Sequence, residues 1–376
     1  MSDRRLQLAI VAFTALAAGL SLYLFSATLP IYLFLRQGYS LQLVGDLIGL
    51  ASVVQLVATL LAGPIVDRRG ARLAIRLGSA CYLVAAAIFL FTAWLPAIAL
   101  ARVLQGVGIA LVLPAVFSIV PGLVSRRFQG TALGLLGAFN NVALAIGPPL
   151  GLWLLNFGPQ TLFGAALVTA ALALAISLPL RVGMAATEPG KLFKYRMSWT
   201  PMYTITLLCV IYWGVVTAFL PIAVPPNQLQ NVGWFFTADA LAVMAARIPA
   251  GYLADRFGSR WLLVSGVGVT GGSIAVLLAT PSFLTLVFAG IGTGVGAALL
   301  LPPILLELTK RSDQSDRGTA MALYNTAFAA AVGIGSFGGA IVVERFGFNT
   351  ALLASLVCCV ASAPIALATV RRIEDY

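Results

Sequence analysis

Long apolar stretches alternate with short polar segments along the whole chain. Twelve of them reach the roughly 20 residues that a helix needs to cross about 30 Å of hydrocarbon. They cover residues 6–34, 41–66, 72–95, 97–124, 129–157, 160–180, 200–224, 231–254, 260–280, 283–308, 318–343 and 348–370. The pattern predicts an all-α membrane protein with twelve transmembrane helices.

The longest connection between apolar stretches, residues 181–199, carries four basic residues and divides the helices into two sets of six. We therefore expect an N-terminal six-helix bundle over residues 1–180, a cytoplasmic linker over 181–199 and a C-terminal six-helix bundle over 200–376. The first stretch is too long for a signal peptide and has no small-residue cleavage site after it, so we expect it to be kept as a helix.

Composition agrees with this pattern. Hydrophobic residues make up 60% of the chain and charged residues 9%, whereas about a quarter of the residues of a soluble protein are charged. His is absent, so any proton coupling must use carboxylates. The four cysteines, Cys81, Cys209, Cys358 and Cys359, all lie in apolar stretches without metal-ligand spacing, which predicts no metal, no cofactor and no disulfide.

The net charge of +11 is explained by where the basic residues fall. With both termini inside, most Lys and Arg residues lie at cytoplasmic helix ends, as the positive-inside rule requires. Only Arg36 and Arg345 fall at outer ends, and Arg102 and Arg247 lie within helices. We therefore expect a multi-pass protein of a prokaryotic cytoplasmic (inner) membrane with both termini cytoplasmic, and no binding of nucleic acid.

One charged ten-residue pattern occurs twice, at residues 63–72 (GPIVDRRGAR) and 251–260 (GYLADRFGSR). The two copies are 188 residues apart, which is half of 376. The same offset relates further short matches, among them Gly130-Thr131-Ala132 to Gly318-Thr319-Ala320. Because each half holds an even number of helices, equivalent positions end on the same side of the membrane, which makes this a parallel repeat.

With these features the chain resembles the major facilitator superfamily, and the resemblance covers essentially its whole length. It implies two six-helix halves around a central cavity, and a transporter that works by alternating access. The resemblance also implies a monomer whose partners are a small-molecule substrate, protons and the lipid bilayer.

The repeated turn resembles the loop between the second and third helices of that family. Asp67 and Asp255 lie at helix C-termini, where the macrodipole disfavours a negative charge, so each needs a partner. The resemblance implies a cytoplasmic gate that holds the two halves together when the cavity opens outward; the alternative is a topological anchor of ordinary inside charges. The gate residues are Gly63, Asp67, Arg68, Gly70, Arg72, Arg247, Gly251, Asp255, Arg256, Gly258 and Arg260.

In the fourth stretch, the run Arg102-Val103-Leu104-Gln105-Gly106 resembles a second motif of the family. A guanidinium within a span costs at least about 2.5–3.5 kcal/mol unless it faces a bundle interior or water. The spacing of three places Arg102 and Gln105 on one helix face, which we expect to line the cavity. The alternative is an arginine that only snorkels to the interface.

The fifth stretch carries Gly134 and then Gly147-Pro148-Pro149-Leu150-Gly151. This run resembles the glycine and proline motif that the family's antiporters, drug exporters among them, carry. Proline bends a helix and glycine lets a partner helix approach closely. The predicted helix-packing motif comprises Gly134, Gly147, Pro148 and Gly151, with Gly335 and Gly339 in the second half.

Asp239 lies eight residues into the eighth stretch, where a carboxylate needs a partner or a proton. We expect it to carry protons or to bind substrate; the alternative is a carboxylate that merely faces water in the cavity. Other polar residues on cavity-type helices complete the predicted substrate and proton pathway, which comprises Arg102, Gln105, Asn140, Asn141, Tyr212, Trp213, Asp239, Tyr324 and Asn325. For each Asn, a neighbouring helix is the alternative hydrogen-bond partner. Glu307 and Lys310 are expected to form a surface pair.

An enzyme is not expected, because the sequence shows no nucleophile elbow, metal cluster or paired carboxylates on one helix face. The first hypothesis is a secondary transporter, a proton-coupled exporter of a small organic molecule. The second is an importer or facilitator of an organic anion or sugar, for which Arg102 supplies the anion site. The third is a transport-inactive sensor or assembly protein with the same fold.

Overall fold

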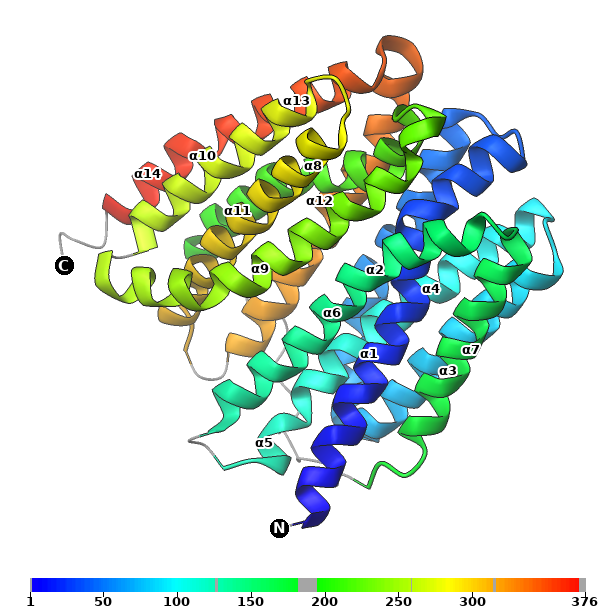
Figure 1. Cartoon of the computed structure of the whole chain (residues 1–376). Helices are drawn as coiled ribbons and strands as arrows, with labels where there is room; N and C mark the ends of the chain where they lie inside the picture. The colour runs from blue at the N-terminus through cyan, green and yellow to red at the C-terminus, as the bar shows by residue number, and fades with distance from the viewer. Residues whose placement is uncertain (1, 126–127, 182–194, 258, 314–315, 372–376) are drawn as a thin grey trace. The chain divides into compact units, whose positions relative to one another are not determined.

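The computed structural model describes residues 2–125, 128–181, 195–257, 259–313 and 316–371. At residues 2–3, 60–69, 121–122, 130, 248, 254–257, 260, 317–318 and 369–371 the description covers the backbone alone. Within these ranges the chain is helical and contains no β-strand. Figure 1 shows the helices as long rods joined by short connections.

The helices of the N-terminal half are α1 (Ser2–Ile31), the π-helical turn η1 (Tyr32–Arg36), α2 (Leu41–Arg69), α3 (Ala71–Phe91), α4 (Leu95–Ser118), α5 (Val120–Leu123), α6 (Gln129–Leu155) and α7 (Pro159–Ser177). Those of the C-terminal half are η3 (Met197–Trp199), α8 (Thr200–Ala223), η4 (Pro226–Gln228), α9 (Leu229–Phe257), α10 (Ser259–Leu277), α11 (Phe283–Lys310), α12 (Arg317–Phe346), α13 (Phe348–Ala361) and α14 (Ala363–Arg371).

Each of the twelve predicted ranges contains a helix. Within the described residues, ten helical segments are long and apolar enough to cross a membrane. The two remaining ranges correspond to α9 and to α10, whose described apolar part, Trp261–Leu277, is shorter. The all-α membrane fold is therefore confirmed, whereas the count of twelve crossings stays a prediction.

The chain divides into two compact units. Unit 1 comprises Met1–Tyr32 and Leu50–Pro189, and unit 2 comprises Leu33–Gly49 and Gly190–Tyr376. This differs from the predicted domain ranges because Leu33–Gly49 groups with unit 2. Within unit 2, Gly45 of α2 lies close to α12, because a Cβ added at Gly45 would lie 2.5 Å from the Cβ of Ala340.

The two units repeat one pattern of helix packing. In unit 1, α1 packs on α6 and α7, and α3 packs on α4 and α7. In unit 2, α8 packs on α12 and α13, and α10 packs on α11 and α13. Each helix of the second set lies at the same place in its half as its counterpart in the first. The internal repeat of the sequence is thus a repeat of structure.

Glycines make close helix contacts in both units, at positions that the 188-residue offset relates. At four glycines of unit 1 an added Cβ would lie closer than 3.0 Å to a neighbouring residue: Gly78 to Val112, Gly106 to Ala51, Gly108 to Tyr82 and Gly147 to Tyr23. The same holds at four glycines of unit 2: Gly266 against Leu300, Gly294 against Asp239, Gly296 against Thr270 and Gly335 against Ile211. In all four pairs both partners are shifted by 188 residues. Lipid supplies no hydrophobic drive between helices, so such close approach supplies the packing energy.

A substitution at one of these contacts tests the packing. Gly335→Ala places a Cβ against the carbonyl of Ile211 and the Cα of Gly214, whereas Gly338→Ala, in the same helix, meets no atom within 4 Å. We expect Gly335→Ala to destabilise the fold by about 1–3 kcal/mol, as overpacking does, and to lower the apparent melting temperature in detergent. Gly338→Ala serves as the matched control and should leave that temperature unchanged or raise it. Equal melting temperatures for both variants would contradict the packing account.

Candidate transport site

The buried arginine of unit 1 has a partner on its own helix. Arg102 and Gln105 lie on α4, are 8% and 2% exposed, and the guanidinium donates a hydrogen bond from Nη1 to Oε1 of Gln105. They therefore share one helix face, as the spacing of three predicts. The next residue, Gly106, brings α4 against the carbonyl of Ala51 in α2. An arginine at this depth is costly unless it is satisfied internally, and Gln105 supplies part of that satisfaction.

The buried carboxylate of unit 2 also has a partner, which lies on a neighbouring helix. Asp239 on α9 is 5% exposed, and the hydroxyl of Thr293 on α11 donates a hydrogen bond of 2.7 Å to its Oδ1. Gly294, next to Thr293, lets α11 approach the backbone carbonyl of Asp239. This hydrogen bond spans 54 residues of sequence.

The two polar pairs occupy related places in the repeat. Shifting Gln105 by 188 residues gives Thr293, and shifting Ala51 gives Asp239. In unit 1 the polar residue of the α4 contact bonds a cation, and in unit 2 its counterpart on α11 bonds a carboxylate. Each unit therefore buries one charge beside the same glycine-mediated helix contact, and the two charges are opposite in sign.

The asparagines of α6 lie next to α1. Asn140 is partly buried, and its Nδ2 donates to the hydroxyl of Tyr23 at 3.3 Å. Asn141 is also partly buried. Asn140 thus has the neighbouring-helix partner that the sequence left as the alternative to a substrate contact.

Trp213, one of the aromatic candidates of unit 2, lies beside the first turns of α9. Trp213 on α8 packs edge-on against Phe236, with ring centroids 5.8 Å apart, and the ring centroid of Phe235 lies 6.4 Å away. Tyr212 is buried beside Trp213. On α12, Tyr324 is buried, whereas Asn325 is exposed. Arg247, eight residues beyond Asp239 on α9, is partly buried.

Most of the predicted cytoplasmic gate lies outside the part of the chain whose side chains the structure describes. This applies to Gly63, Asp67, Arg68, Asp255, Arg256, Gly258 and Arg260. Four gate residues are described, among them Arg247, which is partly buried. Gly70 separates α2 from α3 with φ 86°, a left-handed conformation that favours glycine, and Arg72 is exposed in the first turn of α3. Gly251 has no atom within 4 Å of an added Cβ.

The predicted helix-packing motif divides into contacting and open positions. Gly147 and Gly151 lie against α1, where an added Cβ would come within 2.6 Å of Tyr23 and 2.5 Å of the Leu24 carbonyl. Gly335 and Gly339 lie against α8 in the same way. Pro148 is buried inside α6. Gly134, by contrast, is exposed and meets nothing within 4 Å.

A network of ion pairs in unit 2 was missed from the sequence. Arg196 bonds Asp313 and Asp316, which precede α12, with 2.9 Å between its Nε and the Asp316 carboxylate. These bonds raise the pKa of Arg196, the hydrogen bond to Asp313 being the largest cause. Trp199 is fully buried, and its Nε1 donates to the Arg311 carbonyl at 3.2 Å. The network therefore ties the segment before α8 to the connection between α11 and α12.

The expectation that Glu307 and Lys310 form a surface pair was wrong for Glu307. Its side chain is 2% exposed, and it pairs with Lys310 at 3.3 Å and with Arg311 at 3.5 Å. Packing of α11 against its neighbours buries this face of the helix end, and the two cations satisfy the carboxylate that burial would otherwise destabilise.

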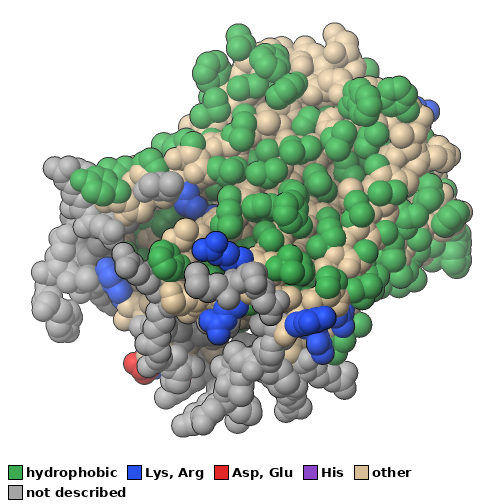
Figure 2. All heavy atoms as spheres, turned by 60° about the horizontal axis from the view of Figure 1, so that its bottom comes forward, with side chains coloured by type: hydrophobic (Ala, Val, Ile, Leu, Met, Phe, Trp, Pro, Cys, Tyr) green, Lys and Arg blue, Asp and Glu red, His purple; other side chains and the backbone are tan. Residues whose placement is uncertain are grey.

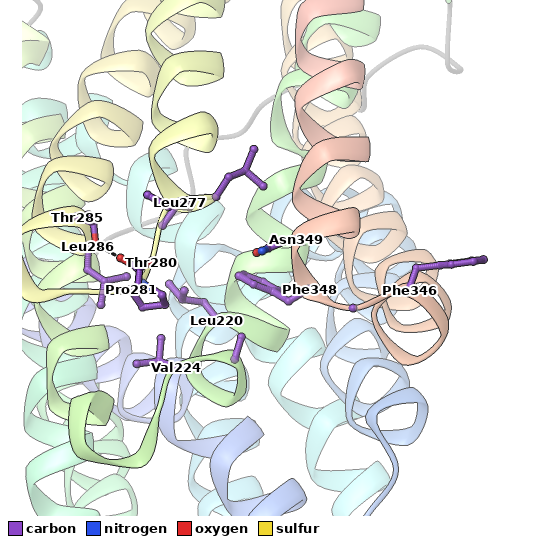
Figure 3. A pocket seen from close by; sticks show the side chains of 14 residues that line it. Leu220, Val224, Leu277, Thr280, Pro281, Thr285, Leu286, Phe346, Phe348 and Asn349 are labelled. Atoms are coloured by element: carbon purple, nitrogen blue, oxygen red, sulfur yellow. Dashed lines mark hydrogen bonds between the residues drawn. The ribbon is translucent and has the colours of Figure 1, made fainter.

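Two hollows occur in the described part of unit 2. The first, about 500 Å³, lies between the end of α8 and the connections that precede α11 and α13; it is lined by apolar side chains, Thr280, Thr285 and Asn349 (Figure 3). The second, about 650 Å³, is a shallow apolar groove between α9 and α11. Neither contains a residue of the predicted pathway.

Long apolar helices arranged as a duplicated bundle define a polytopic membrane protein. The family model of the Major Facilitator Superfamily matches residues 11–226 and 202–375. The chain therefore belongs to the Major Facilitator Superfamily, and this confirms the predicted family and the prediction of a transport protein rather than an enzyme.

Relatives and solved structures agree. The chain is 25% identical over 335 residues to an uncharacterised MFS-type transporter of Salmonella typhimurium, covering 85% of this chain and 86% of that one. It is 24% identical over 283 residues to multidrug resistance protein 1 of Bacillus subtilis, covering 71% and 72%. A peptide transporter solved in complex with sulfate superposes with a TM-score of 0.83 at 14% identity, over 98% of this chain and 94% of that one, which shows a shared fold.

The Asp239 contact can be tested by an isosteric change. Thr293→Val removes the only hydroxyl of that side chain and leaves the Asp239 carboxylate without this donor. We expect a loss of about 1–3 kcal/mol, the cost of a buried polar group that loses its partner, seen as a lower melting temperature of the purified protein. Thr326→Val is the matched control, because the hydrogen bond described for Thr326 goes to the Ala322 carbonyl of its own helix. If the two variants melt together, the hydrogen bond contributes nothing to the fold.

Proposed function

We propose that the chain is a secondary active transporter that exports a small organic solute in exchange for protons, by alternating access of its two units. The observation that carries the proposal is the buried carboxylate Asp239, which Thr293 holds between α9 and α11. In a chain without His, a carboxylate is the side chain suited to take up and release a proton at such a place.

The chemistry of a carboxylate explains why Asp239 suits this role. A carboxylate either holds a proton or, when ionised, pairs with a cation. A proton and an organic cation therefore compete for the one side chain. Such competition is what exchange requires, and the similarity to a multidrug resistance protein supports export as its direction.

Arg102 supports the second candidate, an importer or facilitator of an organic anion or sugar. Its guanidinium is buried on α4 beside Gln105, and a cation at such a place attracts an anionic group of a bound solute. Transport that needs no pH gradient would favour this candidate. The third candidate, a transport-inactive sensor or assembly protein, requires that solute bind without flux.

The proposed location is a prokaryotic cytoplasmic (inner) membrane, with both termini cytoplasmic and the protein monomeric. The support is the positive-inside rule, since Arg4, Arg5, Arg72 and Arg181 are exposed and all lie at helix ends that the twelve-span topology places inside.

The proton role is tested in proteoliposomes. The solute is chosen from a panel of amphipathic organic ions as the compound that most raises the melting temperature, because a ligand that binds the folded state stabilises it. We expect Asp239→Asn to reduce transport driven by an imposed pH gradient to the gradient-free level, because the amide neither takes up nor releases a proton, while solute counterflow continues. Glu344→Gln, at an exposed carboxylate of α12, is the control and should behave as wild type. Full gradient-driven transport by Asp239→Asn would exclude the proton role, and loss of counterflow as well would assign Asp239 to solute binding.

The gate is tested separately. The proposed role of Asp67 is to hold the outward-open state, so Asp67→Asn should increase the labelling rate of single cysteines placed at inner-gate positions and lower the transport rate. Asp46→Asn, far from the repeated turn in sequence, is the control. Unchanged labelling and transport in Asp67→Asn would leave only the topological-anchor interpretation.

A further inference from the structure

Five arginines gather at one end of unit 1. Arg4 and Arg5 lie in the first turns of α1, Arg72 and Arg76 in the first turns of α3, and Arg181 four residues beyond the end of α7. Helices α1 and α3 both pack on α7, and the three rods run side by side (Figure 1). All but Arg76 are exposed, and Arg76 is partly exposed.

Hydrogen bonds hold these helix ends together. The guanidinium of Arg76 donates from Nε to the carbonyl of Ser177 at 3.4 Å and from Nη2 to the carbonyl of Leu178, so that it caps the end of α7. The backbone N–H of Arg181 donates to Oε1 of the buried Gln7 at 2.8 Å, which ties the segment after α7 to α1. The ends of α1, α3 and α7 therefore form one fixed platform. A guanidinium has five N–H donors, and these bonds use two of those of Arg76.

Few acidic residues accompany these arginines in unit 1. Its ranges contain three acidic residues, Asp3, Asp67 and Glu188, against ten arginines, and all three acidic side chains lie outside the described part. Unit 2 differs, because there Arg196, Lys310 and Arg311 are paired with Asp313, Asp316 and Glu307. Ordinary cytoplasmic charges need only satisfy topology, whereas the unit 1 cluster is a concentrated positive surface built on a fixed platform.

Exposed leucines border the cluster. Leu6 follows Arg5, Leu77 follows Arg76, and Leu178 accepts the hydrogen bond of Arg76, and these side chains are 44–59% exposed. Figure 2, which brings the lower ends of Figure 1 towards the viewer, shows Lys and Arg side chains there beside a largely apolar surface. A ligand that fits must therefore place an anionic group on the arginines and an acyl chain against the leucines.

We propose that the ends of α1, α3 and α7 form a binding site for the headgroup of an anionic phospholipid. Arg76, held by the end of α7, and the exposed Arg72 one turn earlier present their guanidinium groups to the phosphate, since residues four apart share a helix face. Arg4, Arg5 and Arg181 surround it. A bound lipid bridges α1, α3 and α7, which are far apart in the sequence, and so stabilises the packing of unit 1.

The test uses the full-length protein in detergent and native mass spectrometry, which counts bound lipids. The probes are phosphatidylglycerol and phosphatidylcholine with identical acyl chains. We expect one phosphatidylglycerol to be retained in preference to phosphatidylcholine, less so as salt is raised. Each basic residue near an anionic membrane surface strengthens binding about fivefold, so Arg5→Gln with Arg181→Gln should weaken phosphatidylglycerol binding about thirtyfold. Neither residue belongs to the proposed gate or pathway.

The control variant, Arg36→Gln with Arg345→Gln, removes the same amount of positive charge elsewhere. Both arginines are exposed and belong to unit 2, where Arg36 ends η1 and Arg345 lies in α12. This variant should retain wild-type lipid binding. Three results would overturn the proposal. They are equal retention of both lipids, equal loss in the test and control variants, and displacement of phosphatidylglycerol by millimolar inorganic phosphate, which would make the site one for a free anion.

Discussion

Close approach of helix backbones at glycine is the interaction on which the rest of this structure depends. In lipid, helices gain no hydrophobic energy by associating, so contact area and close packing must hold them. Gly106 and Gly294 each bring a helix against a backbone carbonyl of its neighbour, in places that the 188-residue repeat relates. Because these contacts fix the register of α4 on α2 and of α11 on α9, they also fix where Gln105 and Thr293 point.

That register gives each of two buried charged side chains a polar partner. A lone guanidinium or carboxylate within a span is costly. Arg102 bonds to Gln105, which precedes the contact glycine Gly106. Asp239 bonds to Thr293, which precedes the contact glycine Gly294. The repeat therefore supplies a common frame, and divergence between its halves has placed a cation in one and an anion in the other.

Much of the fold was predictable from the sequence, because few backbone conformations are stable in the hydrocarbon of a membrane. Every backbone N–H and C=O group there must be hydrogen-bonded within the protein, which favours helices, so the helix positions followed from the lengths of the apolar stretches. The spacing of Arg102 and Gln105 predicted their shared face. The partner of Asp239 was not predicted, since the Thr293 bond depends on how α9 and α11 align; the offset from Gln105 to Thr293 was the available signal. The burial of Glu307 and the pairing of Arg196 with Asp313 and Asp316 were missed for a similar reason, because both depend on tertiary contacts over long sequence separations or at a helix end.

The central claim, that solute and proton move in exchange, is tested most directly by following protons while the solute supplies the driving force. Proteoliposomes are loaded with a stabilising organic ion and diluted into solute-free buffer of equal pH, with a pH-sensitive dye inside and the membrane potential clamped. The account predicts acidification of the lumen as solute leaves, and no acidification in protein-free liposomes. Solute efflux without any change in internal pH would contradict it.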